Sequence, residues 1–209
     1  METKYTYENI KDNFVVGLKG IFKIVGLKEI IFSVVNILSI SLSIIIIICS
    51  FIFELDEYKL IVEIVGLMVN FLPSILGFTI AGYTLVVGFI QSGMLSKISE
   101  PIEDSKYSLY QNMSSNFALN VIFQGFALIF AFFVHFIIYF DNEIISNIEI
   151  YYYDIINKLG LFLILYWFII SLFLVIQITI NIFNFSQLHH YFINKEKLDK
   201  INNLKKTKK

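Results

Sequence analysis

The stretch IVEIVGLMVNFLPSILGFTIAGYTLVVGFI, from Ile61 to Ile90, decides the fold of this chain. It contains one charged side chain, Glu63, and is longer than the roughly 20 apolar residues that a helix needs to cross a bilayer. Three other stretches share this character. The sequence therefore predicts an all-α integral membrane protein with four transmembrane helices.

Small and polar side chains recur along one face of this stretch at steps of three or four residues, which is the spacing of one side of a helix. This face, called the seam below, comprises Glu63, Gly66, Asn70, Ser74, Gly77, Ala81, Thr84, Gly88 and Gln91. Because lipid offers no hydrogen-bond partners, the seam is expected to face protein or water. It is predicted to be either a packing surface or the wall of a pore.

Composition agrees with a membrane protein. Hydrophobic residues make up 57% of the 209 residues and charged residues only 16%, which is too apolar for an ordinary soluble domain. The single cysteine, Cys49, has no partner for an intrachain disulfide, and no Cys/His spacing indicates a metal site. We expect no metal and no cofactor.

Hydropathy and charge divide the chain into three parts: an N-terminal amphipathic helix lying in the membrane interface, a four-span bundle and a basic tail. The amphipathic helix is predicted over residues 1–28, the bundle over 29–185 and the tail over 186–209. Within the bundle, the predicted spans are about 30–53, 61–90, 116–140 and 159–185, with a loop containing a short helix at 92–115.

The lysines predict how the chain is threaded. All sixteen basic residues are lysines, and fourteen of them lie in 1–28, 92–115 and 186–209. Only Lys59 and Lys158 lie in the other two loops. By the positive-inside rule, both termini and the 92–115 loop are cytoplasmic in a multi-pass protein of the bacterial cytoplasmic membrane.

With this orientation, most amide side chains of the spans fall in the cytoplasmic half and could form one polar cluster. They are Asn36, Asn120, Gln124, Gln177 and Asn181. Such a cluster would serve either to fix helix packing or to line a water-filled vestibule.

Two ionisable residues, Glu63 and His135, fall toward the outer side, where they could pair. Ionisable groups inside a span are costly and therefore candidates for function. Glu63 would otherwise reach the lipid headgroups, or form a ring at the mouth of a cation pore in an oligomer.

The tail combines lysines with scattered apolar residues. Its basic residues are Lys195, Lys197, Lys200, Lys205, Lys206, Lys208 and Lys209. Each basic residue near an anionic membrane contributes about 1 kcal/mol of attraction. The tail is predicted either to anchor on membrane lipids or to dock a cytoplasmic effector protein.

No motif for catalysis is present. The sequence has no GxSxG, P-loop or HExxH pattern, and the acids inside the spans occur singly. We therefore expect no enzymatic activity and no direct binding of nucleic acid.

The run from Leu72 to Phe89, LPSILGFTIAGYTLVVGF, resembles glycine-rich spans in small multi-span proteins encoded in bacterial anti-phage defence islands. The overall plan also looks like the four-span membrane subunit of two-component defence systems such as Kiwa. This resemblance implies a membrane-sited sensor or effector that works with a cytoplasmic partner.

These observations predict a membrane sensor or scaffold that forms a homo-oligomer through the seam. The alternative is an oligomeric ion-conducting pore or membrane-disrupting effector lined by the same face. A pore requires the seam to be hydrated, whereas a scaffold requires it to be dry.

Overall fold

The structure, a computed structural model, describes residues 14–88, 92–100, 106–140 and 150–207. The elements in these residues are all helices. In chain order they are α2 (Gly17–Val25), α3 (Leu27–Ile31), α4 (Val34–Ile52), α5 (Glu57–Gly88), α6 (Ser92–Ile98), α7 (Leu109–Phe140) and α8 (Ile150–Thr207).

Four helical segments are long and apolar enough to cross a membrane, which confirms the predicted all-helical class and the number of apolar helices. They are Leu27–Ile52, Glu57–Gly88, Leu109–Phe140 and Ile155–Ile201. All four segments begin before the predicted spans, and the fourth also continues past residue 185 into the predicted tail.

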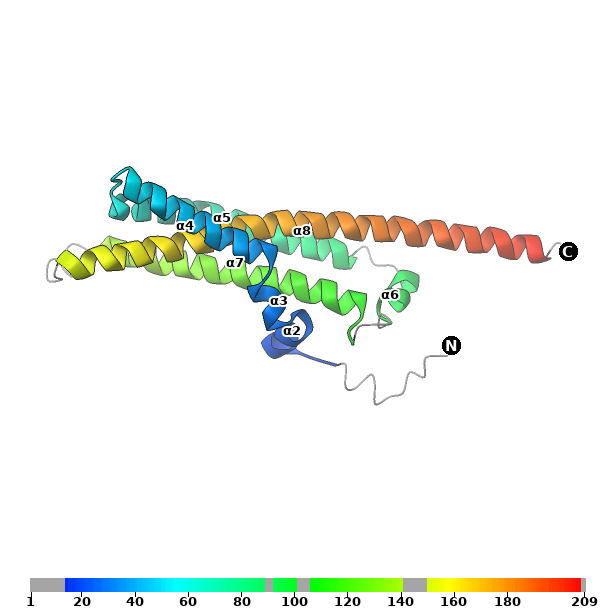
Figure 1. Cartoon of the computed structure of the whole chain (residues 1–209). Helices are drawn as coiled ribbons and strands as arrows, with labels where there is room; N and C mark the ends of the chain where they lie inside the picture. Colours follow the sequence, from blue (N-terminus) through cyan, green and yellow to red (C-terminus); the bar gives the residue numbers. More distant parts are fainter. Residues whose placement is uncertain (1–13, 89–91, 101–105, 141–149, 208–209) are drawn as a thin grey trace.

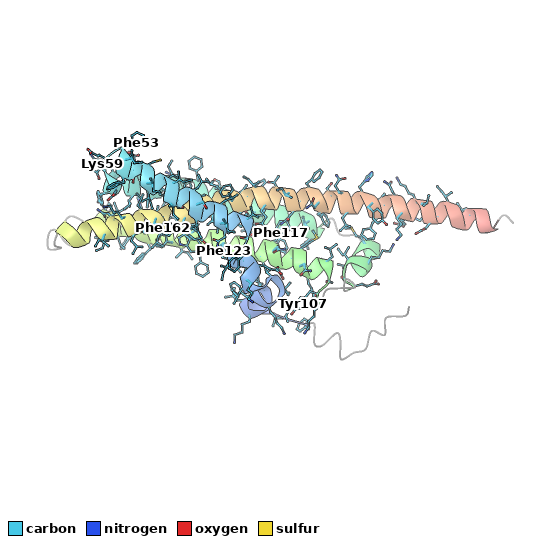
Figure 2. All side chains as sticks on the ribbon, viewed as in Figure 1. Phe53, Lys59, Tyr107, Phe117, Phe123 and Phe162 are labelled. Atoms are coloured by element: carbon cyan, nitrogen blue, oxygen red, sulfur yellow. The ribbon has the colours of Figure 1, made fainter. Side chains whose placement is uncertain are left out.

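The long helices run side by side, with successive helices in opposite directions (Figure 1). Figure 2 shows Phe53 and Lys59, which flank the turn between α4 and α5, at one end, and Tyr107 toward the other. The ammonium of Lys158 lies 5.9 Å from the centroid of the Phe51 ring, so the first turns of α8 lie at the same end as the close of α4.

The chain enters the bundle through two short helices. Gly26 separates α2 from α3 and has a φ of +84°, a left-handed conformation that favours glycine. Ser33 then caps α4, because its hydroxyl accepts a hydrogen bond from the backbone N–H of Asn36 at 3.1 Å. Of the predicted 1–28 helix, the structure describes Gly17–Val25 as helical, and residues 1–13 lie outside the described ranges.

Asp56 plays the same part at the start of α5. Its carboxylate accepts a hydrogen bond from the backbone N–H of Lys59 at 3.2 Å, and this bond is the main reason that the pKa of Asp56 is lowered from its usual value. The turn before α5 is thus closed by a local polar contact, as helix N-termini commonly are.

Two apolar clusters form the core. The first joins α5, α7 and α8 and consists of Ile61, Val65, Met68, Leu72, Ala127, Ala131, Leu161, Ile164 and Leu165. The second adds α6 to the same helices and consists of Val86, Met94, Ile98, Phe117, Ile178 and Phe185. Between the two clusters along these helices lie three fully buried polar side chains, Thr79, Gln124 and Ser171.

Helix α8 is one continuous element of 58 residues, so the predicted basic tail is helical up to Thr207. The physical reason is in the sequence, since no glycine or proline occurs between Leu161 and Thr207. Its C-terminal part projects beyond the ends of the other long helices (Figure 1).

Candidate functional site

The seam lies on the side of α5 that faces away from the core. Its residues Glu63, Asn70, Ser74, Gly77, Ala81, Thr84 and Gly88 are exposed, Gly66 is half-buried, and Gln91 lies outside the described residues. The buried residues of the same helix are Ile61, Val65, Met68, Leu72, Thr79, Gly82 and Val86. At about 100° per residue, the two sets occupy opposite faces. Within the part of the chain that the structure describes, the seam therefore does not take part in internal packing.

The glycines of the seam border open space. A Cβ atom built at Gly66, Gly77 or Gly88 would meet no heavy atom of the surrounding described residues within 4 Å. The polar seam residues partly satisfy themselves, since the Asn70 amide donates to the Gly66 carbonyl and the Thr84 hydroxyl to the Ile80 carbonyl, both at 2.9 Å. These bonds let polar side chains face an apolar surrounding at reduced cost.

Close helix contacts within the chain involve other small residues. A Cβ atom at Gly82 would lie 2.7 Å from Cδ1 of Ile182, so α5 and α8 approach each other there. Helix α4, which packs against α8, buries Ser39, Ser43 and Ser50, and their hydroxyls bond carbonyls of α4 itself. The spacing of these serines, by four and seven residues, is the sequence signal that could have identified this packing face.

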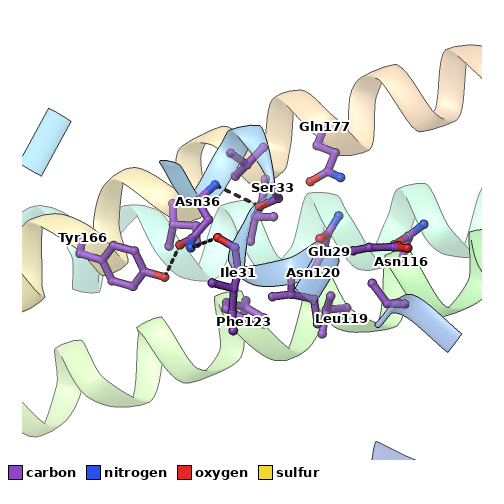
Figure 3. A pocket seen from close by; sticks show the side chains of 15 residues that line it. Glu29, Ile31, Ser33, Asn36, Asn116, Leu119, Asn120, Phe123, Tyr166 and Gln177 are labelled. Carbon is purple, nitrogen blue, oxygen red and sulfur yellow. Dashed lines mark hydrogen bonds between the residues drawn. The ribbon is translucent and has the colours of Figure 1, made fainter. Parts of the chain in front are cut away.

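Three of the five clustered amides do come together. Asn36, Asn120 and Gln177 line a cavity of about 350 Å³ between α3, the start of α4, α7 and α8 (Figure 3). Asn116 and Tyr166 add further polar groups to this cavity. Neither was predicted to belong to the cluster. Asn116 could have been, because it lies one turn before Asn120 on the same face of α7.

One wall of the cavity is held by hydrogen bonds. The Tyr166 hydroxyl donates to Oδ1 of Asn36 at 2.7 Å, and Nδ2 of Asn36 donates to the Ile31 carbonyl at 2.8 Å (Figure 3). These contacts tie the α3–α4 junction to α8. Because its amide oxygen and its amide nitrogen both form these bonds, Asn36 positions this wall of the cavity.

Asn120 differs from Asn36. Its side chain is 3% exposed, and its Nδ2 has no hydrogen-bond partner among the described residues. An unpaired buried donor costs about 1 to 3 kcal/mol, so this atom needs an explanation.

The remaining intramembrane candidates stand apart. Gln124 is fully buried beside Thr79 and does not line the cavity, and Asn181 is half-buried outside it. Glu63 and His135 are both exposed, and within the described ranges no ion pair joins them. The pairing considered from the sequence is absent here because Glu63 faces away from α7.

The tail lysines whose side chains the structure describes are exposed. They are Lys195, Lys197 and Lys200, and the last of these forms an ion pair with Glu196 at 3.0 Å. Such an exposed pair contributes little to stability. Lys205 and Lys206 belong to α8 without described side chains, and 208–209 lie outside the described residues.

Known proteins do not help to place this chain. No protein-family model, curated protein or solved structure matches it. In the part of the chain that the structure describes, no group of three or more His, Cys, Asp and Glu residues could hold a metal ion. The link to defence systems thus rests on the resemblance of Leu72–Phe89 and of the four-span plan alone.

Proposed function

We propose that this chain is a multi-pass membrane protein that acts as a sensor or scaffold, assembling with copies of itself through the seam and presenting the end of α8 to a cytoplasmic partner. The observation that carries the proposal is the exposure of the seam on the side of α5 opposite the core. The resemblance of Leu72–Phe89 makes anti-phage defence the proposed setting.

Small residues support assembly because helices in a membrane associate by close packing rather than by a hydrophobic driving force. At Gly77 and Gly88 a second helix could approach to backbone distance, since no described residue of the chain fills the space there. The internal bonds of Asn70 and Thr84 allow each copy to insert before it assembles.

Helix α8 supports the second half of the proposal. Its 58 residues correspond to about 87 Å at 1.5 Å per residue, far more than the roughly 30 Å of hydrocarbon in a bilayer. The part beyond the bundle carries exposed lysines, including Lys195 and Lys197. A rigid helix of this kind would transmit a conformational change in the bundle to a protein bound at its end.

Cysteine cross-linking tests the assembly. In a Cys49→Ser background, which removes the exposed native thiol, Gly77→Cys and Ala81→Cys should form covalent dimers in membranes on mild oxidation. Phe78→Cys is the matched control, because it is exposed and adjacent in sequence but about 100° around the helix. Equal cross-linking at all three positions, or none at any, would contradict a seam interface.

Bilayer recordings test the alternative, an ion-conducting pore or membrane-disrupting effector. In an oligomeric pore lined by the seam, Glu63 would stand near one mouth and attract cations. Glu63→Gln should then reduce cation selectivity, and Thr84→Leu should block conduction. A purified oligomer that conducts nothing at any voltage would exclude the pore and favour the scaffold.

A further inference from the structure

The amide-lined cavity has the properties of a small-molecule site. Its volume of about 350 Å³ falls within the range of ligand pockets, which are mainly apolar with a few placed polar groups. Leu119, Phe123 and Ile170 supply apolar wall, while Asn120 and Gln177 supply amides. The cavity is separate from the seam, so ligand binding there does not depend on the proposed assembly.

The unpartnered donor of Asn120 points to a ligand. A buried N–H group is normally paired with protein or with bound water, and Nδ2 of Asn120 pairs with no described residue. Because this atom is a donor, its missing partner must offer an acceptor such as an oxygen. A bare metal ion offers none, so a simple cation site does not account for it.

The charge of the residues that line the cavity restricts the class of ligand further. Among the described residues that line it, Glu29 is the one charged side chain, and no described lysine or histidine contributes to the wall. An anion would find no counter-charge there, whereas an ammonium group would pair with Glu29. Figure 3 shows Glu29 beside Asn116, and no hydrogen bond joins Asn116 or Gln177 to another described residue.

We propose that the cavity binds a zwitterionic group in which an N–H-bearing ammonium pairs with Glu29 and an oxygen accepts from Nδ2 of Asn120. The aminoethyl phosphodiester group has both features and no net charge. It occurs as the headgroup of phosphatidylethanolamine and, without acyl chains, in water-soluble glycerophosphoethanolamine.

The single tryptophan provides a built-in reporter. Trp167 has its ring centroid 5.9 Å from that of Phe123 and 5.6 Å from that of Tyr166, and both of these rings line the cavity. Its fluorescence should therefore change when the cavity is filled. The full chain would be placed in nanodiscs that contain no phosphatidylethanolamine and titrated with short-chain phosphatidylethanolamine or glycerophosphoethanolamine.

Choline analogues of both probes are the ligand controls. They keep the positive charge and the phosphodiester but replace the three N–H donors by methyl groups. The ethanolamine forms should give a saturable signal with at least tenfold tighter binding than the choline forms. Binding of only the acylated probe assigns the site to a lipid, and equal binding of both ethanolamine probes assigns it to the headgroup alone.

Three variants test the residues. Asn120→Leu and Glu29→Gln should each weaken ethanolamine binding about tenfold, the loss of one charged or buried hydrogen bond. Gln124→Leu, four residues along α7 and outside the cavity, is the matched control and should bind as wild type. Glu29 is exposed, so its variant tests the site without risk to the core.

Two results would overturn the proposal. The first is the absence of a saturable response to either ethanolamine probe. The second is equal affinity for ethanolamine and choline forms, because N–H recognition by Glu29 would then play no part. A change in stability of Asn120→Leu with unchanged affinity for the ethanolamine probes would likewise leave Asn120 with a structural role only.

Discussion

The hydroxyl of Thr79 on α5 donates a hydrogen bond to Oε1 of Gln124 on α7 at 2.7 Å, and both side chains are completely buried. This bond lies between the two apolar clusters and joins helices at positions 45 residues apart in sequence. Nε2 of Gln124 has no partner within the described structure, so the bond through Oε1 is what offsets the burial of this amide.

A double-mutant cycle measures this bond. Thr79→Val should lower the unfolding free energy by about 1 to 3 kcal/mol, because it leaves Gln124 with an unpaired acceptor as well as an unpaired donor. Thr79→Val combined with Gln124→Leu should recover most of the loss, since no buried polar group remains. Equilibrium unfolding in mixed detergent measures these free energies. If the losses of unfolding free energy in the two single variants simply added in the double variant, the contact would be contradicted.

Substitutions of two glycines on α5 should separate folding from assembly. Gly82→Leu places a side chain where a Cβ atom alone would lie 2.7 Å from Ile182, and overpacking of this kind costs about 1 to 3 kcal/mol. Gly77→Leu meets open space in the single chain, so it should leave monomer stability unchanged while reducing the oligomer. Thermal unfolding and size in mild detergent give the two readouts. If the two substitutions changed thermal stability and oligomer size equally, the seam would not be separate from the internal packing of α5.

The lysine distribution predicts a threading that chemical labelling can check. In a Cys49→Ser background, a membrane-impermeant thiol reagent added to intact cells should modify Leu55→Cys, in the exposed turn before α5, and spare Asp199→Cys near the end of α8. Permeabilised cells provide the control, because both positions should then react. Labelling of Asp199→Cys in intact cells would reverse the predicted orientation.

The end of α8 should bind anionic surfaces by charge. Replacing Lys195, Lys197 and Lys200 by glutamine should weaken binding to anionic liposomes, most strongly at low salt, where screening is least. Deletion of residues 195–209 removes all seven lysines of the tail, so it is the stronger variant and should reduce the salt dependence further. Co-sedimentation at several salt concentrations measures both, and binding that does not vary with salt would point to apolar contacts.

Sequence alone was enough for the features that depend on a single helix. Long apolar runs with few charges require helices in a low-dielectric medium, since only a helix satisfies its own backbone there. The sequence also contains the reason that α8 continues into the basic tail, the absence of glycine and proline after Gly160, although the predicted fourth span ended at residue 185. The small residues of the seam do share one face of α5, as their spacing predicted.

Only the tertiary structure decided which faces meet. Periodicity fixes angles within one helix, but it does not fix how that helix is rotated against its neighbours. Two stripes of small residues were available: the serines of α4 turned inward against α8, while the seam turned outward. The tertiary structure also decided the partners of the amides. Asn36 bonds Tyr166, which is 130 residues away in sequence, while Gln124 bonds Thr79. Such contacts depend on how side chains of different helices interlock.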